Sequence, residues 1–165
     1  MHYCFSQYEK EYDGDEDSDG EWIRPEEELL PISTQRGKHG VFDPEDLVQL
    51  LRWENATDIC AIKMPKYVAY TDFLVICTAT SARHARALCE RVNKVYKMRR
   101  NSRDSLSVRI SGEKDPNWKA MDMDNIILHI MTAETRQKYD IEQLWIVGPE
   151  NDSIVNEMAE EKLIG

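Results

Sequence analysis

The stretch DFLVICTATSARHARALCERVNKVYKM, residues 72–98, decides the fold class of this chain. Its first part, Asp72–Ala79, is a continuous apolar run, which is typical of a central strand covered on both faces. Thr80 or Ser81 then supplies an N-cap, and apolar side chains recur at helical spacing to about Met98. A buried strand followed by an amphipathic helix indicates an α/β domain. The predicted inner face of the helix comprises Ala85, Leu88, Cys89, Val92, Val95 and Tyr96.

Flanking elements extend this pattern in both directions. Asp43-Pro44 is a typical helix start, with Asp43 as the N-cap, and the helix is expected to end near Asn55. Strands separated by helices, then a run of strands, predict a mixed five-stranded sheet with flanking helices. The predicted strands are residues 58–64, 72–79, 105–112, 118–123 and 125–132, followed by a short helix at 133–140 and an extended segment at 141–148.

Charge divides the chain into parts. The net charge is −10, and residues 1–30 hold eleven acidic residues against two basic ones. A segment so acidic and poor in aliphatic side chains cannot offset its ordering entropy by burial. We therefore expect an acidic, disordered extension at 1–40, a domain at 41–148, and a tail at 149–165 with a short amphipathic helix. No apolar run approaches the about 20 residues of a membrane span, and the N-terminus resembles neither a signal peptide nor a mitochondrial presequence.

The sequence shows no recognisable catalytic motif. It contains no P-loop, nucleophile elbow or G-x-G-x-x-G, and its four cysteines form no C-x-x-C pair. Cys60 and Cys77 lie in apolar strand-like runs, where a small buried thiol is the ordinary interpretation. We expect no catalytic residue, no metal and no cofactor.

One pair of acidic residues leaves an enzymatic alternative open. Asp122 and Asp124 are two apart at the edge of a predicted strand, so their carboxylates could share a face and hold a metal for nucleotidyl transfer. Such a site also needs a glycine that lets the backbone approach a phosphate, and residues 78–84 contain none. Metal-dependent nucleotidyl transfer therefore stays a rival hypothesis, to be tested by magnesium-dependent nucleotide incorporation.

Two further groups of residues are candidate contacts. Residues 83–109 contain nine Lys or Arg and only two acids, so the outer helix face is either a solvated surface or a contact for RNA phosphates. The candidate phosphate contacts are Arg83, Arg86, Lys94 and Lys97. Trp118, Met123 and Tyr139 belong to types enriched at interface centres, and their spacing alone leaves core packing and interface anchoring open.

Three ordered blocks of this chain resemble the ribosomal silencing factors, also called the Iojap family. The blocks are TDFLVICTATSARHARALCERV at 71–92, WKAMDMDNIILHIM at 118–131 and ETRQKYDIEQLW at 134–145, and the resemblance covers about residues 42–147. The ENATDIC start at 54–60, the acidic extension and the tail are most similar to the mitochondrial branch of the family.

The resemblance implies a nucleotidyltransferase-like fold without catalytic activity. It also implies binding to the large ribosomal subunit through ribosomal protein fourteen, with steric exclusion of the small subunit during assembly or translational repression. A small LYR-motif protein and the mitochondrial acyl carrier protein are implied partners, and the mitochondrial matrix is the implied location. An adaptor that recruits partners without blocking subunit joining remains an alternative.

Carried over by motif, Trp118, Met123 and Tyr139 match family positions that contact ribosomal protein fourteen. The chain departs from the family at Asp124, where a glycine is common, which leaves the local turn geometry open. The motif positions expected to support or border the contact are Asp122, Asn125, His129, Arg136, Ile141, Glu142 and Trp145.

Overall fold

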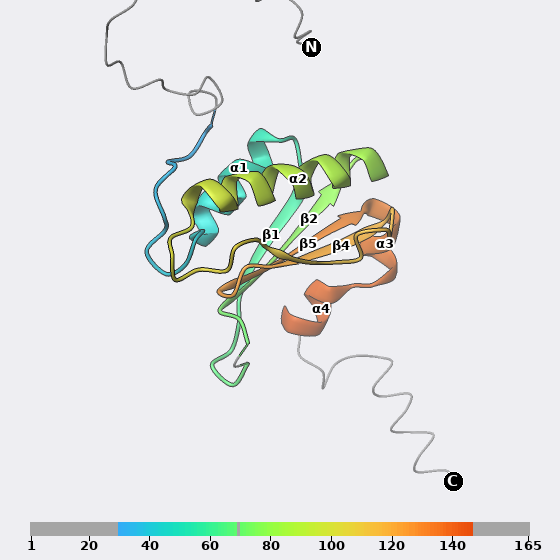
Figure 1. Cartoon of the computed structure of the whole chain (residues 1–165). Coiled ribbons are helices and arrows are strands. Elements are labelled where there is room, and N and C mark those ends of the chain that lie inside the picture. Colours follow the sequence, from blue (N-terminus) through green and yellow to red (C-terminus); the bar gives the residue numbers. More distant parts are fainter. Residues whose placement is uncertain (1–29, 69, 147–165) are drawn as a thin grey trace, which may run out of the picture.

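A five-stranded sheet in the order β1-β2-β5-β4-β3 lies between two unequal helical layers (Figure 1). The computed structural model describes residues 30–68 and 70–146. β2 and β5 are parallel, and the other neighbouring pairs are antiparallel. The predicted mixed α/β sheet with five strands is therefore confirmed. The strands are β1 (Thr57–Lys63), β2 (Phe73–Ala79), β3 (Arg109–Ser111), β4 (Trp118–Asp122) and β5 (Ile126–Thr132).

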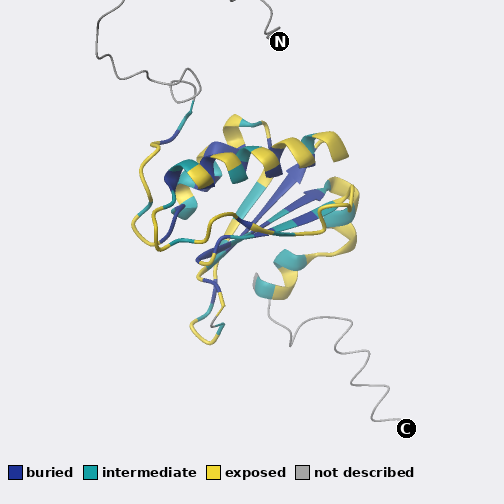
Figure 2. Cartoon of the chain, in the orientation of Figure 1, coloured by how far each residue is buried: buried dark blue, intermediate teal, exposed yellow. Residues whose placement is uncertain are grey.

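The two helical layers differ in size. Helices α1 (Pro44–Trp53) and α2 (Ala82–Arg99) cover one face and enclose the main hydrophobic core. Two six-residue helices, α3 (Ala133–Lys138) and α4 (Ile141–Ile146), lie against the other face (Figure 1). The buried residues are accordingly concentrated between the sheet and the α1/α2 layer (Figure 2).

The long helix forms where the sequence predicts it. Ser81 is the N-cap, and its hydroxyl accepts a hydrogen bond from the backbone N–H of His84 at 3.1 Å. All six predicted inner-face residues are buried, and the four basic residues predicted on the outer face are exposed. Asp43 precedes α1 as predicted, but its carboxylate accepts from the backbone N–H groups of Lys38 and His39 rather than from the helix. This carboxylate therefore closes the loop before the helix.

Alternation along the strands assigns each side chain to one layer. In β4, Lys119 and Met121 are buried on the α2 side, while Trp118 packs with the smaller hydrophobic cluster on the opposite face. In β5, Leu128 belongs to the main core and its neighbour His129 points the other way, toward Trp118. This two-residue period is what an ordinary strand imposes, and it fixes which residues can meet at a site.

Two predicted elements differ from the structure. Residues 141–146 form helix α4, not an extended segment, because Asp140 caps the helix by accepting from the Gln143 N–H at 3.1 Å. Ile141 and Trp145, four residues apart, then pack together on the smaller cluster. The third strand is limited to β3: of the two apolar residues predicted just before it, Val108 is buried but Leu106 is 76% exposed.

Residues 30–40, predicted as part of the disordered extension, pack onto the domain instead. Ile32 is 9% exposed and belongs to the main core, with Leu30 packed against it. Arg36 donates two hydrogen bonds of 2.8 Å to the carboxylate of Asp104, in the loop after α2. The Arg36 guanidinium lowers the pKa of Asp104 to about 2. The predictions for residues 1–29 and for the tail lie outside the described residues, and no described helix is long and apolar enough to cross a membrane.

Candidate protein-binding face

The sheet face opposite α1 and α2 is only partly covered. Its buried cluster is small, and several of the hydrophobic side chains packed against it remain partly exposed, Trp118 and Trp145 among them. Around Trp118, the strand residues Ala120 and His129 are also only half-buried. We call Trp118, Ala120, His129 and Tyr139 the aromatic face. The four buried members of the cluster beneath and beside it are Met64, Leu74, Ile76 and Met131.

Trp118 is held in the aromatic face by one hydrogen bond and two ring contacts. Its indole Nε1–H donates to His129 Nδ1 at 2.9 Å, so the polar edge of the ring is satisfied within the protein. The ring of Tyr139 lies 5.3 Å from the ring of Trp118, centroid to centroid, and the His129 ring lies at 5.7 Å. Aromatic groups at these distances stabilise one another. Tyr139 is nevertheless 46% exposed, so the group presents apolar surface to solvent.

His129 acts here as a neutral hydrogen-bond acceptor. Burial lowers its pKa from the usual value, since a desolvated imidazolium is disfavoured. Because Nδ1 accepts from Trp118, the neutral ring carries its proton on Nε2. Protonation of Nδ1 would replace an acceptor with a donor and break the bond that orients Trp118. The histidine therefore has a positioning role at this face.

Arg136 and Glu142 attach the two short helices to the sheet. Arg136 donates to both carboxylate oxygens of Glu142, to the hydroxyl of Thr78 at 2.8 Å and to the carbonyl of Asp58. The arginine lowers the pKa of the Glu142 carboxyl. These bonds connect α3, α4, β1 and β2 at one place. They hold Tyr139, which lies between the two helices, close to Trp118.

The carboxylates of Asp122 and Asp124 both have partners in the structure, one in the β4–β5 turn and one in Arg109. The Asp122 carboxylate accepts from the backbone N–H of Asp124 at 3.0 Å, which closes the turn between β4 and β5. Arg109 reaches both carboxylates, at 2.8 and 3.4 Å. Asp124 has φ 67°, in the left-handed region that favours glycine, so the turn persists here without a glycine. The pair forms a charged rim beside the aromatic face.

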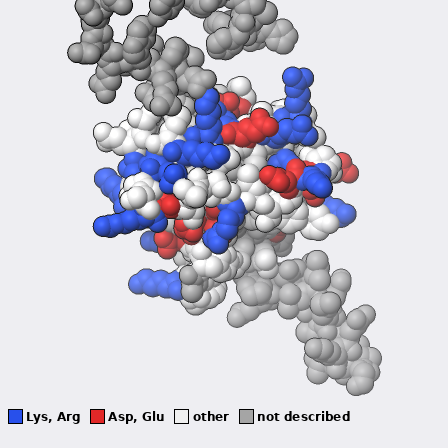
Figure 3. Space-filling model, viewed as in Figure 1, with Lys and Arg blue, Asp and Glu red and all other residues white. Residues whose placement is uncertain are grey.

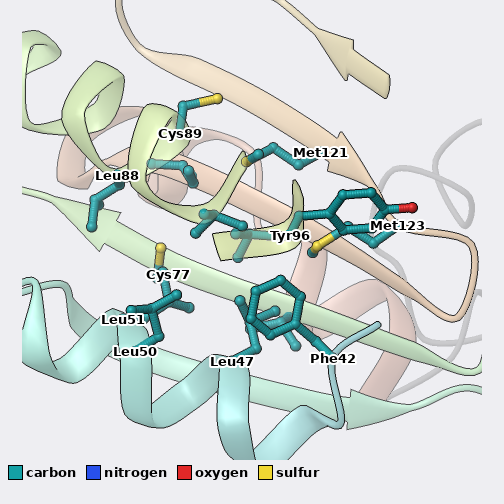
Figure 4. Close-up of a cluster of buried hydrophobic side chains, with 14 of the residues drawn as sticks. Phe42, Leu47, Leu50, Leu51, Cys77, Leu88, Cys89, Tyr96, Met121 and Met123 are labelled. Atoms are coloured by element: carbon teal, nitrogen blue, oxygen red, sulfur yellow. The ribbon is translucent and has the colours of Figure 1, made fainter. Parts of the chain in front are cut away.

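Two residues predicted at the contact lie elsewhere. Met123 is 2% exposed and belongs to the main core, beside Tyr96 (Figure 4). It is an odd number of positions from Trp118, so alternation directs it into the α1/α2 layer. Asn125 is 8% exposed and donates to the carbonyl of Phe42 at 2.9 Å, which secures the loop before α1. Neither side chain can contact a partner on the aromatic face in this structure.

The remaining predicted residues occupy defined places. Ile141 and Trp145, both on α4, pack on the smaller cluster and attach this helix beside the aromatic face. The candidate phosphate contacts are exposed along α2, in the opposite helical layer, so they form a separate surface from the aromatic face. These four residues are Arg83, Arg86, Lys94 and Lys97.

Sequence reasoning missed several residues of this region. Ala120 and Arg109 could have been found from strand pairing, because Ala120 is opposite His129 and Arg109 is opposite Asp122. In the connection between β1 and β2, Tyr67 is 80% exposed and Tyr70 is 62% exposed. Val68, in the same connection, packs on the smaller cluster. Two exposed tyrosines in one short connection were a visible signal of further apolar surface.

The fold and the face define a small α/β domain that presents an aromatic surface of the kind found at protein interfaces. A family model described as "Ribosomal silencing factor during starvation" matches residues 43–163. The chain belongs to this family of ribosomal silencing factors.

Individual relatives agree with this assignment. The chain is 39% identical over 119 residues to a mouse protein named mitochondrial assembly of ribosomal large subunit protein 1, a match that covers 72% of this chain and 52% of the mouse protein. It is 27% identical over 129 residues to the ribosomal silencing factor of Zymomonas mobilis, covering 76% of this chain and 94% of that protein.

Solved structures support the fold. A crystal structure of a Chromobacterium violaceum protein aligns with a TM-score of 0.53 at 22% identity and covers 67% of this chain and 92% of that one. A Bacillus halodurans structure aligns with a TM-score of 0.50 at 23% identity, covering 60% and 89%.

Proposed function

We propose that this chain binds the large ribosomal subunit through ribosomal protein fourteen and blocks joining of the small subunit. The observation that carries the proposal is the paired arrangement of Trp118 and Tyr139 on the thinly covered face of the sheet. Family membership supports a role at the ribosome. The name of the mouse relative supports assembly of the mitochondrial large subunit as the setting.

The aromatic face has the composition of an interface centre. Aromatic side chains bury a large area at modest entropy cost, and a few of them usually dominate the binding energy. Trp118 is held in place before binding by His129, so little freedom is lost when a partner covers it. Charged side chains at the margin, Arg109 with Asp122 and Arg136 with Glu142, would form a polar rim.

The proposed mechanism is steric and involves no bond making. The aromatic face docks on ribosomal protein fourteen, and the α1/α2 layer on the far side of the sheet projects from the subunit. That bulk occupies space needed by the small subunit. Assembly of the large subunit and repression of translation both follow from such a block.

Sedimentation of ribosomal subunits tests this proposal. Wild-type chain, Tyr139→Ala and Trp118→Ala are each added to separated mitochondrial subunits, and the monosome peak is measured after a sucrose gradient. Trp53→Ala is the matched control, since Trp53 is 57% exposed on α1 in the opposite layer. Loss of an anchor aromatic should weaken binding about thirtyfold, corresponding to about 2 kcal/mol.

The outcomes separate the hypotheses. The proposal requires that wild type and Trp53→Ala co-sediment with the large subunit and reduce the monosome peak. The aromatic-face variants should do neither. A folded Tyr139→Ala variant with wild-type affinity for ribosomal protein fourteen would refute the docking face. If wild type binds and monosomes still form, the adaptor hypothesis replaces the steric one.

We further propose the mitochondrial matrix as the location, with a small LYR-motif protein and the acyl carrier protein as partners. Support comes from the resemblance to the mitochondrial branch and from the mouse relative. Co-purification from mitochondria, with and without the Tyr139→Ala change, tests whether these partners use a different surface from the ribosome. Partners that survive the change while the large subunit is lost would establish separate surfaces.

The nucleotidyltransferase alternative has little structural support. Arg109 already pairs with both Asp122 and Asp124, so a metal would have to displace a guanidinium. Magnesium-dependent nucleotide incorporation that disappears in Asp122→Asn would nevertheless restore that hypothesis.

A further inference from the structure

The C-terminal end of α2 and the following loop form a surface of unusual charge. Residues 91–103 contain six Lys or Arg and no Asp or Glu. Two of these side chains are used internally, Arg91 with Glu54 and Arg99 with Asp46. Others point outward at the side of the molecule where α2 ends, and Lys and Arg gather there in the space-filling view (Figure 3). We call Lys97, Arg100 and Arg103, with Lys38 two residues after Arg36, the basic end.

The described part of the chain enters the domain beside this basic end. Leu30 and Ile32 pack on the main core, and Arg36 is fixed to Asp104, one residue beyond Arg103. Whatever precedes residue 30 is therefore attached to the chain within six residues of Arg36, which is bonded to the loop after α2. The preceding 29 residues hold eleven acidic and two basic residues, whereas residues 30–146 hold fifteen acidic and eighteen basic ones.

We propose that the acidic N-terminal segment, residues 11–28, folds back and covers the basic end of α2. Charge complementarity favours this occupant, and its attachment beside the surface raises its local concentration to the millimolar range typical of short tethers. This inference is independent of the proposed ribosomal function.

The length of the segment is sufficient. An 18-residue α2 spans about 27 Å at 1.5 Å per residue. Glu28 is two residues from Leu30, and Glu11 is nineteen residues away, which allows up to about 60 Å when extended. The acids can therefore reach every position of the basic end without displacing the packed residues 30–42.

The contact would act as an intramolecular shield. Nucleic-acid phosphates bind Lys and Arg by releasing counterions, and an acidic segment competes for the same side chains. The shield would reduce non-specific RNA binding and leave the aromatic face, on the opposite side of the sheet, open. Because the Debye length falls to about 3 Å at 1 M salt, the contact should disappear at high ionic strength.

Carbodiimide crosslinking of the full chain tests the contact directly. This reagent joins carboxylates to lysine amines with no spacer, and peptide mass spectrometry of the monomer fraction identifies the pairs. We expect crosslinks from residues 11–28 to Lys97 and Lys38 at 50 mM salt and none at 1 M salt. The controls are Lys63 and Lys138, both exposed but placed on β1 and α3. Equal crosslinking to Lys138 and Lys97, or none to Lys97, would overturn the proposal.

A heparin-binding experiment distinguishes docking from general charge repulsion. Neutralising the acids at residues 13–19 in the full chain should raise heparin affinity by roughly threefold or more at low salt. In a background with Lys97→Gln, Arg100→Gln and Arg103→Gln, docking predicts that this gain is lost. A gain of the same size in that background would mean repulsion alone and would overturn the proposal.

Discussion

Replacing Arg136 with methionine should detach α3 and α4 from the sheet. Arg136 binds both oxygens of Glu142, the Thr78 hydroxyl and the Asp58 carbonyl, so one substitution removes every one of these links. Methionine keeps much of the side-chain volume, which limits the change to charge and hydrogen bonding. The expected consequence is loss of stability together with loss of the geometry around Tyr139.

The magnitude follows from the burial of the pair. The side chains of Arg136 and Glu142 are 13% and 26% exposed, so the pair is intermediate between a surface pair and a buried one. A surface ion pair contributes up to about 1 kcal/mol, whereas breaking a buried pair costs about 3–5 kcal/mol. We therefore expect Arg136→Met to lower the free energy of unfolding by about 2–3 kcal/mol. The control is Arg109→Met, whose pair with Asp122 is 69% and 36% exposed and should cost under about 0.5 kcal/mol.

Urea unfolding followed by circular dichroism measures both variants, and a double-mutant cycle with Glu142→Gln isolates the coupling. Hydrogen exchange should show faster exchange in residues 133–146 of Arg136→Met and unchanged exchange in α2. If Arg136→Met costs no more than Arg109→Met, or if the cycle shows no coupling, the argument that this pair anchors the short helices is refuted.

Three smaller predictions follow from individual residues. Arg36 lowers the pKa of Asp104 to about 2, so this carboxylate contributes stability above about pH 4 that is lost as the pH falls toward 2. In an acid-unfolding titration, Asp104→Asn should therefore lose less stability than wild type between about pH 4 and pH 2. Burial raises the pKa of Cys77 to about 12, so iodoacetamide at pH 8 should alkylate half-buried Cys60 well before Cys77, as peptide mass spectrometry would show. Asp124→Ala should cost about 1 kcal/mol in urea unfolding, because alanine is strained at φ 67°, whereas Asp124→Gly should cost less.

The central elements could be predicted because their signals are local. Residues 72–98 contain an apolar run, a capping serine and a helical period, and together these were sufficient to place β2 and α2. Helix α4 was missed because a β-rich composition at 141–148 outweighed a short helical period. The Asp140 cap and the four-residue spacing of Ile141 and Trp145 were the better indicators.

The packing of residues 30–40 depends on contacts distant in sequence. Arg36 meets Asp104 across 68 positions, and Asn125 meets Phe42 across 83. Charge and hydropathy in a local window do not contain such information, so composition alone extended the acidic segment too far into the domain. The local signs of burial were Leu30 and Ile32, and the Val41-Phe42 pair just after this segment.

The candidate site shows how strand alternation separates its residues. Trp118 and Met123 both looked suitable as anchors by type, but five positions along one strand and turn place them on opposite sides of the sheet. Counting positions along the strand is enough to show that the two side chains cannot share a face. The same count adds Ala120, which shares the face of Trp118 and lies opposite His129.

The two sides of the sheet differ in how far helices cover them and in the charge of their surface. On one side, a small cluster and two short helices leave Trp118 and Tyr139 accessible, and Arg136 fixes their surroundings. On the other, α1 and α2 form a closed core with basic side chains outside. The function proposed above requires one face that binds ribosomal protein fourteen and an opposite face that does not bind the subunit. A face that presents lysine and arginine would itself bind RNA phosphates, and the contact proposed above between residues 11–28 and the basic end would reduce that binding.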